Sequence, residues 1–209
     1  MEEYLVPTKE GVDELTEKRS RFIGHIWRTD TEEEAIAAIR ATRERLWDAR
    51  HHVYAYLIRG GAMRYSDDGE PQGTGGMPVL DVLRRQELNN VCCVVTRYFG
   101  GILLGTGGLV RAYSKAAALA VDAAGISIMR LWQRVAIPCP YPLFERIKLE
   151  IAAYEGDVIS TDYGTQVDIC VRIPLGSVEK FCLRLTDLSS GKITAIPGAQ
   201  EYLPGPWKK

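Results

Sequence analysis

The sequence lacks the residue patterns that mark secreted, membrane-spanning and metal-binding proteins. Its 209 residues include only three histidines and five scattered cysteines, with no C-x-x-C pair, whereas structural zinc sites need closely spaced Cys and His ligands. No apolar stretch reaches the roughly 18–20 residues that a membrane helix needs, and the start, MEEYLVPTKEG, is too acidic for a secretory signal. These absences predict a cytoplasmic protein with no membrane partner, no bound metal and no cofactor.

A strong net charge is also missing. The 26 basic and 27 acidic residues leave a formal charge of −1, so no overall field attracts nucleic acid. The 46% hydrophobic and 25% charged residues are ordinary for a globular protein and exclude a disordered chain or a simple coiled coil. Arginine outnumbers lysine by 18 to 8, which suits phosphate or carboxylate binding but also follows from genomic base composition.

The scarce thiols and imidazoles are expected to have structural roles. Three histidines leave little room for a catalytic triad, and His25, on an alternating segment, is predicted to be half-exposed. Apolar neighbours around every cysteine predict buried, reduced thiols. The cysteines are Cys92, Cys93, Cys139, Cys170 and Cys182.

The residue periodicity predicts an α+β protein of two domains, residues 1–128 and 129–209. In the first, an α/β layer is expected, because apolar strand-like runs alternate with helical patterns. Its predicted strands are 20–28, 52–59 and 91–98, and its predicted helices are 31–49 (with a Thr31/Glu34 capping box), 76–88 and 109–124. The second has the order β-α-β-β-α-β, which is the ferredoxin-like unit. Its predicted strands are 131–138, 156–162, 166–174 and 193–202, and its predicted helices are 141–154 and 177–188.

The segment Thr96–Tyr113 reads TRYFGGILLGTGGLVRAY. Glycines allow positive φ and close approach to a ligand, and the following helix start offers unpaired N–H groups with partial positive charge. We therefore predict an anion cradle, although the glycines also suit close packing of an Ala-rich helix. The segment is neither a P-loop nor a dinucleotide fingerprint. The candidate residues are Arg97, Tyr98, Phe99, Gly100, Gly101, Gly105, Thr106, Gly107, Gly108, Arg111, Tyr113 and Lys115.

A second constellation is the acidic turn in YSDDGEPQGTGGM, Tyr65–Met77. Asp67, Asp68 and Glu70, with His51 on the preceding strand, form a candidate polar site for acid/base chemistry or a divalent metal. The alternative is a plain turn in which Asp caps its own backbone. The sequence leaves open whether this turn faces the glycine loop.

These two segments carry a resemblance. SDDGEPQGTGGMPVL and VVTRYFGGILLGTGGLVRAYS resemble the signature of the IMPACT/YigZ family over roughly residues 17–125, with Gly75 where the family pattern GTAG has Ala. The resemblance implies an N-terminal fold related to a small-subunit ribosomal protein and to domain IV of elongation factor G. It also implies a ferredoxin-like C-terminal domain related to domain V of that factor. Eukaryotic members of the family regulate translation through a starvation-responsive initiation-factor kinase and associate with ribosomes.

The leading hypothesis is a non-catalytic protein that binds RNA or the ribosome in translation regulation. Arg97 and Arg111 would hold phosphates, while Tyr98, Phe99 or Tyr113 would stack on bases. One alternative is an enzyme acting on a phosphorylated small molecule or nucleotide, with Mg²⁺ on the acidic turn. Another is a protein-interaction module with a translation factor or regulatory protein as partner. The particular RNA or partner and the oligomeric state stay open.

Overall fold

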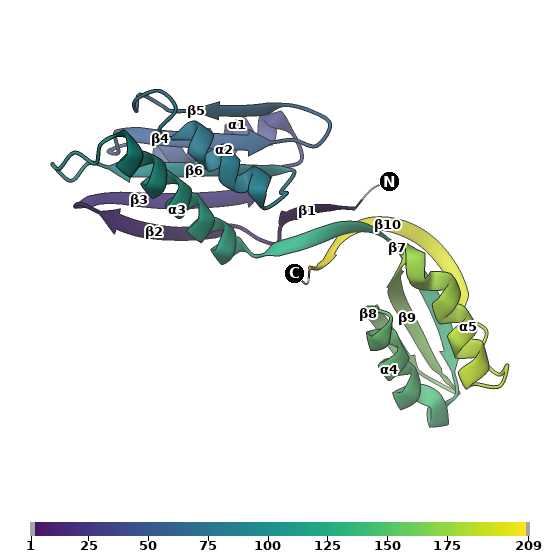
Figure 1. The fold of residues 1–209 in the computed structure, drawn as a ribbon. Coiled ribbons are helices and arrows are strands. Elements are labelled where there is room, and N and C mark those ends of the chain that lie inside the picture. Colours follow the sequence, from purple (N-terminus) through teal and green to yellow (C-terminus); the bar gives the residue numbers. More distant parts are fainter. Residues whose placement is uncertain (1–2, 208–209) are drawn as a thin grey trace. The chain divides into compact units, whose positions relative to one another are not determined.

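The structure, a computed structural model, describes residues 3–207 (Figure 1). The described chain divides into two compact units. One comprises residues 4–128 together with the chain from 204 onward, and the other comprises residues 129–203 together with Glu3. Both units combine helices with an antiparallel sheet, so the mixed α+β class predicted from the sequence is confirmed.

The unit of residues 4–128 is built on an antiparallel sheet with the order β2-β3-β6-β4-β5. These strands are β2 (Gly11–Glu17), β3 (Ser20–Arg28), β6 (Val91–Tyr98), β4 (His51–Leu57) and β5 (Met63–Ser66). The sequence prediction missed the two edge strands. β2 is largely polar and exposed, and β5 has only four residues, so neither carries the alternating apolar pattern of a half-buried strand.

Helices cover both faces of this sheet (Figure 1). α2 (Gly76–Arg85) and α3 (Thr106–Ala124) pack on one face, and α1 (Glu32–Arg45) packs on the other. Because side chains alternate along a strand, Val95 joins the α2/α3 core while Val94 joins the core under α1. The predicted capping of α1 is confirmed, since the Thr31 hydroxyl accepts a hydrogen bond from the Glu34 N–H.

Close packing of α3 depends on glycines in the strands. A Cβ on Gly11 would lie 2.4 Å from the Ala120 carbonyl oxygen, and one on Gly24 would lie 2.5 Å from that of Ala116. Real Cβ atoms do not approach so closely, so only glycine lets the helix backbone rest on β2 and β3. The sequence pattern pointed to the loop glycines for this role instead.

The other unit carries the element order β7-α4-β8-β9-α5-β10, as the periodicity predicted. In its sheet β7 pairs with β9, β9 pairs with β8, and β10 pairs with β7. The elements are β7 (Ile126–Cys139), α4 (Phe144–Ala153), β8 (Asp157–Tyr163), β9 (Val167–Pro174), α5 (Val178–Leu188) and β10 (Ile196–Pro206), with 3-10 turns η1 (Tyr141–Leu143) and η2 (Leu175–Ser177) before the helices. Helices α4 and α5 lie against this sheet (Figure 1). Ile151 of α4 and Phe181 of α5 belong to the hydrophobic core that also includes strand residues. The short strand β1 (Tyr4–Pro7), which the sequence did not predict, belongs to the unit of residues 4–128.

The predicted burial of the cysteines holds for three of the five. All five cysteines are free, and Cys92, Cys93 and Cys139 are buried, whereas Cys170 and Cys182 are partly exposed. Burial raises the pKa of the Cys93 thiol to about 12. Among the described residues, no helix is both long enough and apolar enough to cross a membrane.

Candidate anion-binding site

The loop between β6 and α3 uses its glycines in two ways. A Cβ on Gly100 would lie 2.0 Å from the backbone carbon of Arg19, so this glycine allows contact with the β2–β3 turn. Gly101 and Gly105 have φ of 82° and 74°, in the left-handed region that favours glycine. A Cβ on either would meet no described atom within 4 Å. The space in front of the loop is therefore open.

The start of α3 has the features of an anion-binding helix terminus. Its N-cap is Gly105, no side chain caps it, and its first turn has no acidic residue. The first N–H groups of a helix have no intrahelical partner and carry a partial positive charge. In this 19-residue helix, the unpartnered N–H groups and the partial positive charge lie at the exposed residues Thr106 and Gly107.

A cavity of about 380 Å³ lies at this helix start and joins the two constellations of the sequence. Glu70 of the acidic turn and His51 of β4 line it together with the loop and Arg97 of β6. The question that the sequence left open is thereby answered, because Glu70 faces the glycine loop. The full lining is Arg50, His51, Glu70, Pro71, Arg97, Phe99, Leu103, Leu104, Gly105, Thr106 and Leu109.

Arg97 and Glu70 form a buried ion pair at the inner wall of the cavity. Arg97 Nη1 lies 2.7 Å from Glu70 Oε1, and the side chains are 6% and 4% exposed. The Tyr113 hydroxyl donates to the same carboxylate oxygen over 2.8 Å. Burial and the neighbouring Glu70 carboxylate raise the pKa of Tyr113 above its ordinary value. Because such a pair is costly to break, these three residues hold the wall in one arrangement.

This arrangement corrects two expectations. Tyr113 is fully buried, with its ring edge-on to Phe22 at 5.2 Å between centroids, so it has no face free to stack on a base. Arg97 is 5% exposed, and its guanidinium lies 5.4 Å from the Phe22 ring and 5.5 Å from the Phe99 ring. It is a buried residue of the cavity wall, so it is not placed to contact the backbone of an RNA lying on the surface.

His51 is oriented by the acidic turn. Its Nδ1 lies 2.8 Å from the Asp68 carbonyl oxygen, and since a carbonyl only accepts, Nδ1 carries the proton. Its Nε2 is then directed toward the cavity, 4.0 Å from Glu70 Oε1. The neighbouring His52 is different, because it is buried against the Thr96 hydroxyl at 3.0 Å. Burial lowers the pKa of His52.

Asp67 has the structural role that the alternative interpretation proposed. Its Oδ1 accepts from the N–H groups of Gly75 and Gly76 at 2.9 and 2.8 Å, and its Oδ2 accepts from Gly73 at 2.8 Å. The carboxylate thus fastens the start of α2. A Cβ at Gly75 would lie 2.9 Å from a Val53 methyl carbon, so an alanine there would press on the core without removing these bonds.

Asp68 also has protein partners, because its carboxylate pairs with Arg43 and accepts from the His52 N–H at 2.6 Å. The three acidic side chains of the turn therefore point to three different sets of partners. Within residues 3–207, no group of three or more His, Cys, Asp or Glu side chains is placed to hold a metal ion.

A second hollow of about 230 Å³ lies on the other side of Leu104 and is basic. Arg111 and Lys115 reach it from α3, and Lys18 reaches it from the β2–β3 turn. None of these three cations forms an ion pair with a residue in the described part of the chain, although Glu17 also lines the hollow. We call this hollow the basic groove. The sequence prediction missed Lys18 because it missed β2 and hence the tight turn at Lys18 and Arg19.

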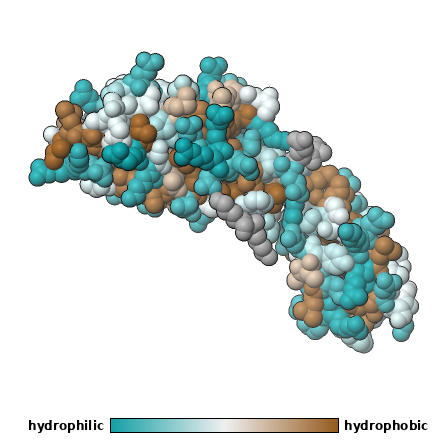
Figure 2. All heavy atoms as spheres, in the orientation of Figure 1, coloured by the Kyte–Doolittle hydropathy of each residue, from teal (hydrophilic) through white to brown (hydrophobic). Residues whose placement is uncertain are grey.

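The tip of the glycine loop exposes apolar side chains beside the 380 Å³ cavity. Leu103 is 82% exposed and Phe99 is 47% exposed, and Figure 2 shows hydrophobic atoms gathered at this tip of the unit. Tyr98 is partly exposed, and its hydroxyl donates to Asp48 at 2.8 Å. Partial burial and this hydrogen bond raise the pKa of Tyr98.

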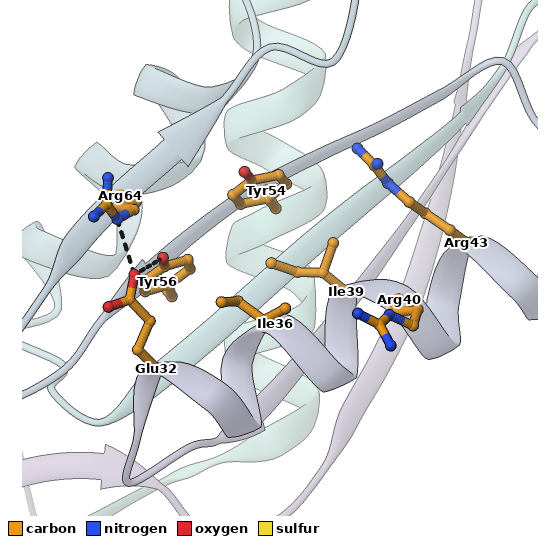
Figure 3. Close-up of a pocket in the computed structure, with 8 residues that line it drawn as sticks. All are labelled: Glu32, Ile36, Ile39, Arg40, Arg43, Tyr54, Tyr56 and Arg64. Atoms are coloured by element: carbon orange, nitrogen blue, oxygen red, sulfur yellow. Dashed lines mark hydrogen bonds and ion pairs between the residues drawn. The ribbon is translucent and has the colours of Figure 1, made fainter.

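A third hollow, of about 500 Å³, lies between α1 and the opposite face of the sheet (Figure 3). Glu32 reaches from the start of α1 to Tyr56 and Arg64, with hydrogen bonds of 2.6 and 2.9 Å. Ile36 and Ile39 point toward the tyrosines (Figure 3). The hydrogen bonds from Tyr56 and Arg64 lower the pKa of Glu32. The sequence showed no sign of this hollow, because its residues come from three separate elements.

Comparison with known proteins places the chain in a family. The Impact N-terminal domain matches residues 18–121, and a domain of unknown function (DUF1949) matches residues 137–192. The IMPACT family member YvyE of Bacillus subtilis is 33% identical, over 96% of this chain and 93% of its own. The chain belongs to the IMPACT family. The Escherichia coli IMPACT family member YigZ is 35% identical, over 94% of this chain and 98% of its own.

A crystal structure described only as that of a hypothetical protein is 34% identical to this IMPACT family member. Its TM-score is 0.60, and the match covers 94% of this chain and 97% of that one. The glycine loop and the acidic turn both lie within the residues matched by the Impact N-terminal domain. The family resemblance carried by these two segments is therefore confirmed.

Proposed function

We propose that this IMPACT family member binds RNA or the ribosome without catalysis and acts in translation regulation. The observation that carries the proposal is the basic groove, where Arg111, Lys115 and Lys18 converge from two elements without ion-pair partners among the described residues. Unpaired cations in a concave surface are suited to phosphate groups. Such a local site needs no overall positive charge.

The glycine loop adds features that suit single-stranded RNA. The ring of Phe99 is half-exposed at the edge of the loop, where a base can stack on it. Thr106, Gly107 and Gly108 offer N–H groups at the helix start to a nearby phosphate. Tyr98 lies on the strand end just before them. The RNA surface would therefore run from the basic groove across the loop.

We also propose that both units are related in fold to domains of translation factors. In the C-terminal unit, β10 and β9 flank β7, and β8 lies beyond β9, an order that supports a ferredoxin-like domain. The resemblance of the N-terminal unit to domain IV of elongation factor G would then give both units relatives among translation factors. A cytoplasmic location follows from such a role.

The alternative functions have less support. An enzyme with Mg²⁺ on the acidic turn needs carboxylates that converge, but Asp67 and Asp68 are engaged with backbone N–H groups and Arg43. A protein-interaction module is favoured by the exposed apolar side chains at the loop tip, of which Leu103 is the most exposed. A translation factor or regulatory protein as partner would use that tip.

The test is RNA binding and ribosome co-sedimentation of the Arg111→Ala/Lys115→Ala variant at several salt concentrations. Removing one phosphate-binding cation should weaken binding similarly for all sequences and reduce the slope of log K against log salt by about one. The double variant should therefore bind more weakly, with a slope smaller by about two.

The matched control is Arg146→Ala/Lys148→Ala, which removes two cations from α4 in the other unit. This control should bind RNA like the wild type. If both double variants and the wild type bind with equal affinity and equal salt slope, the basic groove is not the RNA contact and the proposal is wrong.

A further inference from the structure

The 380 Å³ cavity at the start of α3 is separate from the basic groove and has the chemistry of a small-anion site. We propose that it binds a phosphomonoester attached to an apolar or aromatic body, as in a nucleoside 5′-monophosphate. The phosphate can come from a free nucleotide or from the 5′ end of an RNA. The inference rests on the proposed function only where RNA supplies the phosphate.

Arg97 has an unsatisfied donor in the wall of this cavity. The side chain of Arg97 lines the cavity and is 94% buried, since 6% of it is exposed. Its Nη1 and Nη2 bond to Glu70 and Ser20, but its buried Nε has no hydrogen-bond partner in the described chain. Native proteins rarely leave a buried guanidinium nitrogen unpaired, so the Nε–H group is a charge-assisted donor left over for a phosphate oxygen in the cavity.

The charges around the cavity favour an anion. Glu70 supplies the negative charge of the lining, and Arg97 neutralises it within the ion pair. Arg50, an exposed residue of the lining without an ion pair in residues 3–207, and the positive end of α3 then leave an excess of positive potential. With the proton of His51 on Nδ1, its Nε2 adds a hydrogen-bond acceptor for a phosphate hydroxyl.

The shape of the cavity suits a small ligand with one polar end. The positive φ of Gly105 turns the chain so that the helix start faces the cavity, and a Cβ there would meet nothing within 4 Å among described atoms. Phe99, Leu103 and Leu109 form apolar walls around the polar end. A volume of about 380 Å³ lies within the range of small-ligand sites. A polar end with apolar walls fits a phosphorylated ligand better than inorganic phosphate.

The test uses Thr106→Asp in the full chain. Thr106 is exposed, lines the cavity and is the first residue of α3. A carboxylate at this position stabilises the helix start, so the protein stays folded, yet it repels a bound phosphate over a few ångströms. Isothermal titration of the wild type should show that adenosine 5′-monophosphate binds more tightly than inorganic phosphate and at least about tenfold more tightly than adenosine. Thr106→Asp should weaken binding of the monophosphate by at least about tenfold, with an unchanged or higher Tm.

The control is Ser177→Asp, which adds the same charge at the start of α5 and should leave the affinity unchanged. Equal affinity for adenosine and its monophosphate, no binding of the monophosphate, or equal weakening by both variants would overturn the inference. Arg111→Ala/Lys115→Ala should not alter monophosphate binding, because neither residue lines this cavity.

The source of the phosphate is identified with a ten-nucleotide RNA carrying either a 5′-phosphate or a 5′-hydroxyl. A preference for the phosphorylated RNA that disappears in Thr106→Asp supports an RNA end as the ligand. Binding of the monophosphate with no such preference supports a free nucleotide. If the monophosphate binds but RNA does not, the proposed function fails alone. If RNA binds through the basic groove but the monophosphate does not bind, this inference fails alone.

Discussion

Arg97 and Glu70 show how far a single residue depends on its tertiary partners. The glycine-loop pattern suggested Arg97 as a phosphate contact, but the folded chain buries it against a carboxylate that lies 27 positions earlier. Tyr113 donates to that same carboxylate, which explains a tyrosine within an otherwise small-residue stretch of helix. The residue types predicted a charged site at the glycine loop. The ion pair between Arg97 and Glu70 decided which of these side chains remain available to a ligand.

His25 is the clearest wrong expectation at the residue scale. It was predicted to be half-exposed, yet it is 4% exposed. Its ring stacks on Trp27 with 5.6 Å between centroids, and its Nδ1 is buried without a hydrogen-bond partner in the described chain. Burial lowers the pKa of His25 to about 4. The alternating pattern of β3 did not reveal that both of its faces are covered.

We expect the free energy of unfolding of His25→Phe to fall less steeply on acidification than that of the wild type. The pKa of about 4 in the folded state is below the roughly 6.5 of an unfolded chain. The unfolded state therefore binds the proton first, and the stability present above about pH 6.5 is lost as the pH falls toward 4. Between pH 7.5 and 4.5, the free energy of unfolding should fall by about 1–3 kcal/mol less in the variant than in the wild type.

Urea unfolding at the two pH values measures this difference directly. His52, whose pKa burial also lowers, remains in both proteins, so some pH dependence will persist. Identical losses in the wild type and in His25→Phe would show that His25 is not protonated on unfolding in this range.

At the scale of elements, α3 links the core to the candidate site. Its middle rests on β2 and β3 through Gly11 and Gly24, and its first turn faces the cavity. The Ala-rich face of the helix indicated close packing correctly. The glycines that make it possible were not recognised, because β2 has too polar a sequence to be predicted as a strand.

We expect Gly24→Ala to destabilise the protein by about 1–3 kcal/mol, because overpacking forces a backbone shift. The added Cβ would lie 2.5 Å from the Ala116 carbonyl oxygen. Gly107→Ala is the matched control on α3 itself, where the nearest atom would be the Arg111 guanidinium at 3.6 Å. Alanine at this exposed helical position should be neutral or stabilising by up to about 1 kcal/mol.

Thermal or urea unfolding of both variants measures the contrast. A Gly24→Ala protein as stable as the wild type would mean that α3 moves away from the sheet at little cost. In that case the start of the helix should also move, and the affinity of the cavity for adenosine 5′-monophosphate should change.

At the scale of the whole molecule, the net charge of −1 conceals a local concentration of cations. Lys18, Arg111 and Lys115 meet in the basic groove, whereas many other charges are paired across neighbouring elements, as in Arg184 with Glu150. Binding to a nucleic acid would therefore be local and strongly dependent on salt. Bulk composition averages over this arrangement and cannot predict it.

The distribution of thiols over the molecule gives a further prediction. Cys170 and Cys182 are partly exposed, while the other three cysteines are buried. Burial raises the pKa of Cys92, Cys93, Cys139 and Cys182, so exposure is what separates Cys182 from the three buried thiols. Since the thiolate is the reactive form, a disulfide reagent should modify two of the five thiols rapidly in the native protein. All five should react in denaturant.

The variant Cys170→Ser/Cys182→Ser tests that assignment. It should lose the rapid phase and keep three slow thiols, with a reaction rate that follows unfolding. A rapid phase that persists in this variant would show that a buried thiol is accessible in the native state.

The sequence by itself determined the helices, the central strands, the element order of residues 129–203 and the family, because hydrophobic periodicity and the two glycine-rich segments are local properties of the chain. It missed the edge strands β2 and β5, which lack that periodicity. The tertiary structure alone decided that Glu70 and His51 face the glycine loop, that Tyr113 is buried and that Lys18 joins Arg111. Those contacts join residues from separate strands, turns and helices. Their geometry depends on sheet register and helix packing, which no local pattern specifies.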